Sequence, residues 1–153
     1  MSVADRLTEL GITLPQSASP LALYRPALRT GDLVYVSGQL AMQDGQVLHP
    51  GRLGADLSIE QGQEAARVAS INALAAVNDL LGSLEGTRVV RLAGYVACTP
   101  EFSDQPTVVN GASELLREVL GEKAGVGARL ALGVISLPAN SPVEVELLME
   151  TGA

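Results

Sequence analysis

The run from Ser58 to Gly82, SIEQGQEAARVASINALAAVNDLLG, constrains the fold more than any other part of the chain. Gln61 follows Ser58 by three residues, which is the capping-box arrangement of a helix N-terminus. Gly82 is of the residue type that most often ends helices. Two sets of mostly small or aliphatic residues recur at helical spacing: Ala65, Ala69, Asn72, Ala76, Leu80 and Val68, Ile71, Ala75, Asn78. The run therefore predicts a long helix whose small-residue face lies close to a sheet.

Extended segments flank this helix on both sides. Before it, residues 21–29 and 33–37 are separated by Thr-Gly-Asp, which predicts a hairpin. A further short strand is expected around residues 46–48. After the helix, residues 88–98 are rich in β-branched and aliphatic positions and predict another strand.

A second helix and two more strands complete the chain. Pro106 suits the first turn of that helix, and Gly121 suits its end. The stretch 127–150 then predicts two strands joined by the turn sequence PANSP. The order is two or three strands, helix, strand, helix and two strands. It predicts an α+β domain of two layers, in which two main helices cover one face of a mixed sheet.

The length of the chain fits one such domain. Its 153 residues can fill one core but are too few for two ordinary domains. We expect a single domain over residues 1–153, with an N-terminal extension over about residues 1–20 that forms a short amphipathic helix. This segment lacks the basic start and apolar block of a secretory signal. No apolar run approaches the ~18 residues of a membrane span, so we expect a soluble protein with no membrane partner.

Charge and rare residue types argue against several classes of function. Ten basic and seventeen acidic residues give a net charge of −7, which opposes binding to nucleic acid. Cys98 is the only cysteine, so no disulfide forms within the chain, and a free thiol favours the cytoplasm. One cysteine and one histidine, His49, cannot build a zinc site or a Cys-His nucleophile pair in one chain. We interpret His49 as a loop residue and Cys98 as a small buried hydrophobe.

Arg129 is the unusual residue of the run GARLALGV, which is otherwise apolar and expected to be buried. Burying a guanidinium is costly unless an anion meets it. Alternation puts Arg129 on one face with Ala131, Gly133 and Ile135. A guanidinium can bind a planar carboxylate through two parallel hydrogen bonds, so we expect an anionic partner for Arg129.

The next strand alternates between an apolar face, Val143, Val145, Leu147 and Met149, and a face with Glu144, Glu146, Leu148 and Glu150. A solvated face is the ordinary interpretation of these glutamates. If the two strands form a symmetric hairpin, about seven residues, or on the order of 24 Å, separate Arg129 from Glu144. One chain then cannot easily bring both to one small pocket. If both serve one ligand, they must meet across a subunit boundary.

Four short motifs occur in order: YVSGQ at 35–39, TVVN at 107–110, GARLALGV at 127–134, and VEVE at 143–146 after a Pro-containing turn. Together they resemble the RidA/YjgF family of reactive-intermediate deaminases, also called endoribonuclease L-PSP or translation-inhibitor proteins. The resemblance covers roughly residues 20–150. No single motif is specific, but four motifs in the right order are fairly specific.

The resemblance implies a chorismate-mutase-like α+β fold that assembles as a homotrimer, with ligand clefts between neighbouring subunits. In deaminase members, an arginine at the position of Arg129 binds the carboxylate of an imine or enamine derived from an amino acid. The glutamate at the position of Glu144 is thought to position the attacking water. The other ligand-lining positions correspond to Tyr24, Ser37, Gly38 and Asn110.

The chain also departs from the family pattern. Ala131 stands where many members have a cysteine, and LAL precedes Tyr24 in place of a Gly-Pro entry. The N-terminal helix and the segment HPGRLGADL look like additions. These differences bear on the substrate and the rate. Ala131 does not remove the arginine and water chemistry, since that cysteine is not needed as a nucleophile.

Three functions stay open on the sequence. The leading hypothesis is a hydrolase of small carboxylate-bearing imines or enamines; a held water and a proton acceptor suffice for this reaction, so no metal or cofactor is expected. The alternative is a non-catalytic module whose cleft binds a small carboxylate. Ribonuclease activity rests on family naming alone, and the −7 charge and lack of a histidine pair oppose it. Ordinary structural roles are the alternative for Tyr24, Ser37, Gly38 and Asn110.

Overall fold

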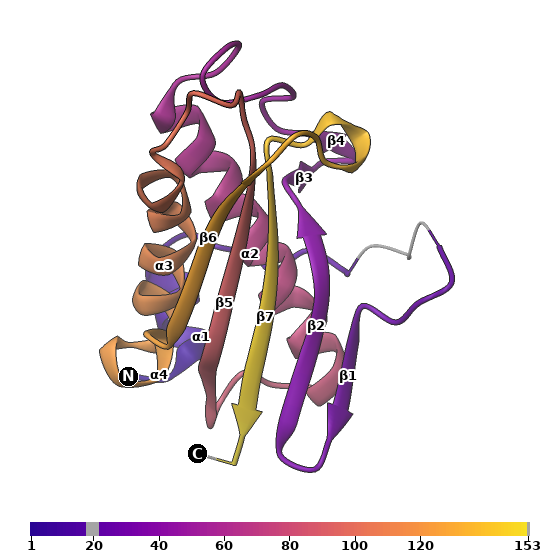
Figure 1. The fold of residues 1–153 in the computed structure, drawn as a ribbon. Coiled ribbons are helices and arrows are strands. Elements are labelled where there is room, and N and C mark those ends of the chain that lie inside the picture. The colour runs from indigo at the N-terminus through magenta and orange to yellow at the C-terminus, as the bar shows by residue number, and fades with distance from the viewer. Residues whose placement is uncertain (18–21, 153) are drawn as a thin grey trace.

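The computed structural model describes residues 1–17 and 22–152. One layer is a five-stranded mixed sheet with the strand order β1-β2-β7-β5-β6. The second layer consists of helices, with α2 and α3 packed on one face of the sheet (Figure 1). The strands are β1 (Ala27–Thr30), β2 (Leu33–Leu40), β5 (Thr87–Ala97), β6 (Ala128–Val134) and β7 (Val143–Thr151). The helices are α1 (Val3–Glu9), α2 (Ile59–Leu81), α3 (Gln105–Leu120) and α4 (Glu122–Gly125).

This architecture confirms the predicted α+β fold class. Strands β1 and β2 form the predicted first hairpin, although residues 22–26 are not in a strand and Leu21 lies outside the described residues. The short strand expected near residue 46 is β4 (Gln46–Val47), which pairs with β3 (Met42–Gln43) in a separate two-stranded sheet. Helix α1 is the short N-terminal helix that the sequence predicts.

Local sequence signals set both ends of α2. The hydroxyl of Ser58 accepts a hydrogen bond from the Gln61 backbone N–H at 3.2 Å, and the Gln61 side chain accepts one from the Ser58 N–H at 3.0 Å. Gly82 ends the helix with a φ of 81°, in the left-handed region that favours glycine. Of the predicted small-residue face, Ala65, Ala69, Ala75 and Ala76 are buried, whereas Leu80 near the end of the helix is exposed. Within the described residues, no helix is both long and apolar enough to span a bilayer.

Helices α2 and α3 approach so closely that one position tolerates only glycine. A Cβ atom built on Gly111 of α3 would collide with the backbone carbonyl of Gln63 in α2. The Gln63 side chain also donates a hydrogen bond to the Thr107 carbonyl at 2.9 Å. This close contact fixes α3 over the sheet.

The last two strands do not form the hairpin that the sequence suggested. Strand β5 lies between them, parallel to β6 and antiparallel to β7. The reason is the crossover through α3: a strand, a helix and a following strand form a β-α-β unit, whose two strands are parallel neighbours. The PANSP segment then leads the chain past the end of β5 to β7. The expected alternation in β7 is confirmed, because Val143, Val145, Leu147 and Met149 are buried.

Strand β6 is therefore an edge strand, and the expectation that its residues are buried is wrong. Most of its residues are exposed or half-buried, including Leu130 and Leu132. These two leucines lie on the sheet face away from α2 and α3, which also presents Leu28 and Tyr35. We call this surface the open face. No helix in the described residues packs over it (Figure 1).

We predict that Gly111→Ala destabilises the fold although alanine favours helices. The added methyl group must push α3 away from the backbone of α2, at a cost of about 1 to 3 kcal/mol. Urea unfolding followed by circular dichroism measures this change. Glu114→Ala, an exposed substitution in the same helix, is the matched control and should be nearly neutral. Equal stability of Gly111→Ala and wild type would contradict the close packing.

Candidate functional site

Helix α3 holds the guanidinium of Arg129. One terminal nitrogen, Nη1, donates to Asn110 Oδ1 at 2.7 Å and to Ser113 Oγ at 3.2 Å. The other, Nη2, donates to the Pro106 carbonyl at 3.3 Å. Asn110 and Ser113 are three residues apart, so they lie on one face of the helix. The side chain of Arg129 thus has a defined orientation between β6 and α3.

These partners are neutral, so the positive charge of Arg129 is not compensated by them. None of the ion pairs among the described residues includes Arg129. The three hydrogen bonds use three of the five N–H donors of a guanidinium. In the part of the chain that the structure describes, no hydrogen bond uses the Nε–H or the second Nη2–H, and such donors suit a carboxylate. The ion pairs among residues 1–17 and 22–152 thus include no anionic partner for Arg129, whose side chain is exposed.

Glu144 lies on the open face against a bulge in β2. Val36 pairs with Leu147 and Gln39 with Val145, so β2 contains one residue more than β7 at this point. The Glu144 carboxylate lies directly over Gly38, where any Cβ atom would collide with Oε1. Gly38 is therefore required for the position of Glu144.

Two effects raise the pKa of the half-buried Glu144 above its ordinary value. The larger is burial, which disfavours the charged form, and the second is the negative charge of Glu146. A carboxylate with a raised pKa is a better proton acceptor when ionised. The environment of Glu144 therefore suits general base chemistry.

Tyr24 and Ser37 line a hollow of about 560 Å³ on the open face. Arg91 and Glu146 also line it and form an ion pair at 3.6 Å. The Ser37 hydroxyl donates to the Arg25 carbonyl, which fixes its orientation. The predicted site residues thus fall into two clusters: Arg129 with Asn110, and Glu144 with Gly38, Tyr24 and Ser37 nearby.

One chain does not bring the two clusters together. Arg129 is level with Leu92 of β5 and Leu147 of β7, whereas Glu144 is level with Tyr95 of β5. The offset is three residues, or about 10 Å along the strands, and not the roughly 24 Å of the hairpin interpretation. The side chains instead lie on opposite faces of the sheet: Arg129 faces α3, and Glu144 is on the open face.

Sequence reasoning missed Ser113 and the Pro106 carbonyl as partners of Arg129. Ser113 could have been found, because it follows Asn110 at helical spacing. The contact between Glu144 and Gly38 had no local signal, because it depends on the register of two strands distant in sequence.

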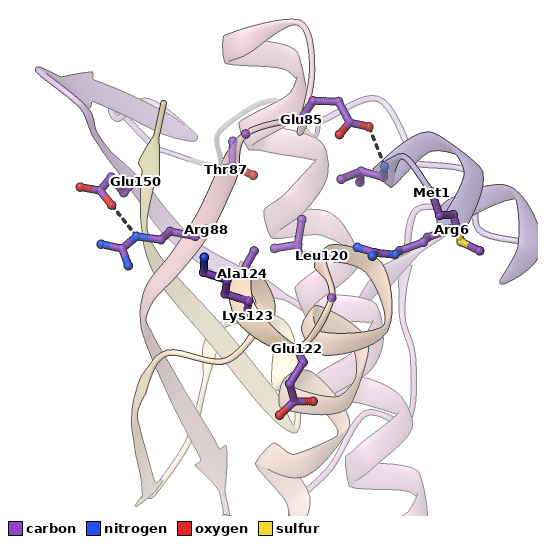
Figure 2. A pocket seen from close by; sticks show the side chains of 13 residues that line it. Met1, Arg6, Glu85, Thr87, Arg88, Leu120, Glu122, Lys123, Ala124 and Glu150 are labelled. Atoms are coloured by element: carbon purple, nitrogen blue, oxygen red, sulfur yellow. Dashed lines mark hydrogen bonds and ion pairs between the residues drawn. The ribbon is translucent and has the colours of Figure 1, made fainter. Parts of the chain in front are cut away.

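Another hollow, of about 680 Å³, lies at the opposite end of the sheet from the PANSP segment (Figure 2). Arg6 and Lys123 line it, together with four charged residues that already have partners, one of which is Glu122, 4.0 Å from Arg117. Arg88 pairs with Glu150, and Glu85 accepts a hydrogen bond from the Val3 N–H at 2.6 Å. None of the predicted site residues lines it. We therefore do not assign the candidate site to this hollow.

The described residues contain no group of three or more His, Cys, Asp or Glu side chains that could hold a metal ion. His49 contacts Glu64, with 2.6 Å between Nε2 and Oε2, and the buried Cys98 accepts a weak hydrogen bond from Gln105 at 3.6 Å. His49 and Cys98 therefore contact two different residues.

Comparison with known proteins identifies the class. Residues 4–151 match the family model described as "YjgF/chorismate_mutase-like, putative endoribonuclease". The chain belongs to this family. It is 41% identical over 149 residues to Protein TCP17 of Trypanosoma cruzi, covering 97% of this chain and 93% of that protein.

Solved structures agree with this assignment. The chain is similar to Atu1372 of Agrobacterium tumefaciens, a protein of unknown function, with 44% identity, a TM-score of 0.90, and coverage of 97% of this chain and 92% of that one. RidA from an Antarctic Psychrobacter species is 23% identical, with a TM-score of 0.58 and coverage of 88% and 94%. This second likeness shows the fold.

We predict that Glu146→Gln lowers the pKa of Glu144, because it removes the neighbouring negative charge. Carbon-13 NMR titration of the glutamate carboxyl groups measures the shift directly. Glu150→Gln is the control, since Glu150 pairs with Arg88 and does not act on Glu144. An unchanged titration of Glu144 in Glu146→Gln would show that burial alone sets its pKa.

Proposed function

We propose that the protein is a cofactor-free hydrolytic deaminase of small carboxylate-bearing imines and enamines, such as 2-iminoacids and 2-aminoacrylate. The observation that supports it most is the guanidinium of Arg129, held by three neutral oxygens, with two N–H donors that bind no other described residue. A fixed, uncompensated guanidinium is suited to bind a carboxylate through two hydrogen bonds. The single thiol, Cys98, supports a cytoplasmic location.

In this proposal the active site lies between subunits of a homotrimer. Arg129 with Asn110 is one half, and Glu144 with Gly38, Ser37 and Tyr24 of a neighbouring copy is the other. Two observations support it. The halves lie on opposite faces of the sheet in one chain. The open face also exposes large apolar side chains, with Leu28 52% and Tyr35 50% exposed, which association would cover.

The chemistry follows from these groups. Arg129 binds the substrate carboxylate and places the imine carbon near a water held by Glu144. The carboxylate of Glu144 accepts a proton as the water oxygen bonds to the imine carbon. Transfer of protons to nitrogen and cleavage of the carbon–nitrogen bond then release ammonia and a 2-oxoacid. An enamine first tautomerises to the imine.

Two other functions compete with this one. A non-catalytic member would bind a small carboxylate at Arg129 without turnover, and the same guanidinium geometry would support it. Endoribonuclease activity is named in the family description, but the net charge of −7 opposes binding of RNA. Experiment must therefore distinguish the deaminase from the non-catalytic member that binds a carboxylate.

We predict that the wild type accelerates hydrolysis of 2-iminopropanoate generated in situ, and that Glu144→Gln loses most of this activity. The amide keeps the shape but accepts no proton, so turnover should fall about 10²- to 10⁴-fold while pyruvate affinity changes little. Wild-type rates equal to the uncatalysed reaction would reject the enzyme and favour the binding module. Equal rates for both proteins would remove Glu144 from the site.

We predict that Arg129→Lys weakens binding of pyruvate-like carboxylates by about 1 to 3 kcal/mol, although the charge is kept. Lysine offers a point charge in place of the planar fork. Calorimetry measures the affinity. Arg67→Lys in α2 is the control; lysine keeps the charge that pairs with Glu118, so this change should leave the affinity unaltered. Unchanged affinity in Arg129→Lys would show that Arg129 only joins β6 to α3.

We predict a homotrimer in solution. Light scattering at micromolar concentration should give about three times the 15.8 kDa mass of the chain. Leu28→Glu, which places charge on the open face, should shift the mass toward the monomer. A wild-type monomer would leave the two half-sites apart and end the intersubunit proposal.

A further inference from the structure

A third hollow, of about 370 Å³, lies beside the end of β6. Most of its lining is apolar, and it includes the single phenylalanine of the chain, Phe102, and the 81% exposed Ile135. The lining residues are Arg52, Cys98, Thr99, Pro100, Phe102, Gln105, Gly133, Val134 and Ile135. An exposed isoleucine at the rim of such a hollow is available to contact an apolar group.

Gly133 lies in the wall of this hollow, beneath two side chains that also line it. A Cβ atom at this position would lie 2.7 Å from Cys98 Sγ and 2.8 Å from Gln105 Nε2, so the two side chains approach the bare backbone. Gln105 is fixed in place, because its amide donates to the Phe102 carbonyl at 2.8 Å and to Cys98 Sγ at 3.6 Å. The wall of the hollow is therefore ordered.

The hollow lies on the same side of β6 as Arg129. Arg129, Ala131 and Gly133 alternate onto the same face of β6, since they pair with Leu92, Gly94 and Val96 of β5. The side chain of Ala131, which lies between Arg129 and Gly133 on this face, is only a methyl group. On the α3 side, the Pro106 carbonyl accepts a hydrogen bond from Arg129, and Pro106 directly follows Gln105 of the hollow.

We propose that this hollow is a specificity subsite that takes the apolar side chain of the substrate whose carboxylate Arg129 binds. The inference rests on the proposed function and names its substrate class: imines of amino acids with branched aliphatic or aromatic side chains. Arg52 is the charged residue of the lining, and its backbone N–H donates a hydrogen bond to the Asp56 carboxylate at 3.1 Å. Most of the other lining residues are apolar, which favours an apolar substrate side chain.

The test compares the imines of alanine, leucine and glutamate, formed in situ by amino acid oxidases. We expect kcat/KM for the leucine imine to exceed that for the alanine imine about tenfold, as extra carbons enter an apolar pocket. Ile135→Ser should reduce this ratio at least threefold and leave the alanine imine unchanged. Gly133→Ala, whose methyl group would displace Cys98 and Gln105 in the wall of the hollow, should also reduce this ratio. Val126→Ser, an exposed residue outside the hollow, is the matched control.

Equal kcat/KM for the leucine and alanine imines, a preference for the glutamate imine, or a ratio unaffected by both hollow variants would overturn the subsite. If no imine is hydrolysed, the proposed activity fails, and calorimetry with stable 2-oxoacids then tests the subsite. Tighter binding of 4-methyl-2-oxopentanoate than of pyruvate, lost in Ile135→Ser, would support it. Equal affinity for the two 2-oxoacids would reject it.

Discussion

The double pairing of β5 determines how the rest of this molecule is arranged. One edge of β5 binds β6 in parallel, and the other binds β7 in antiparallel orientation. Because a crossover connects β5 to β6, helix α3 must lie over the sheet beside β6. This places Asn110 and Ser113 within reach of Arg129. The same pairing sets the register of β7, and with it the position of Glu144 on the other face.

The parts of the fold with local chemical signals could be predicted from sequence. The capping box at Ser58 and the glycine at Gly82 define α2, since both depend on residues within one turn of the helix end. The alternation in β7 was equally local. Which strands pair is not local: the turn sequence PANSP suits a hairpin, and only the crossover through α3 places β5 between β6 and β7. The exposure of β6 followed from that pairing and could not be seen in its apolar composition.

The candidate site also contains residues that local sequence signals reveal and contacts that no local signal reveals. Arg129 was found because an arginine in an apolar strand needs an explanation, and Asn110 through a family resemblance. Ser113 was available from helical spacing but was not used. The close contact between Glu144 and Gly38 arises from a bulge between strands that are more than a hundred residues apart in the chain. Such contacts depend on register and leave no pattern in either segment alone.

The edge position of β6 has a consequence for how the chain avoids misassembly. An edge strand presents unpaired backbone donors and acceptors, and an apolar one invites pairing with strands of other molecules. β6 has the sequence ARLALGV, in which Arg129 is the single charge. A charge within such a strand discourages open-ended pairing of strands. The charge of Arg129 therefore disfavours aggregation through this edge while a chain is not associated with other copies. This effect on assembly is separate from the proposed binding of a carboxylate.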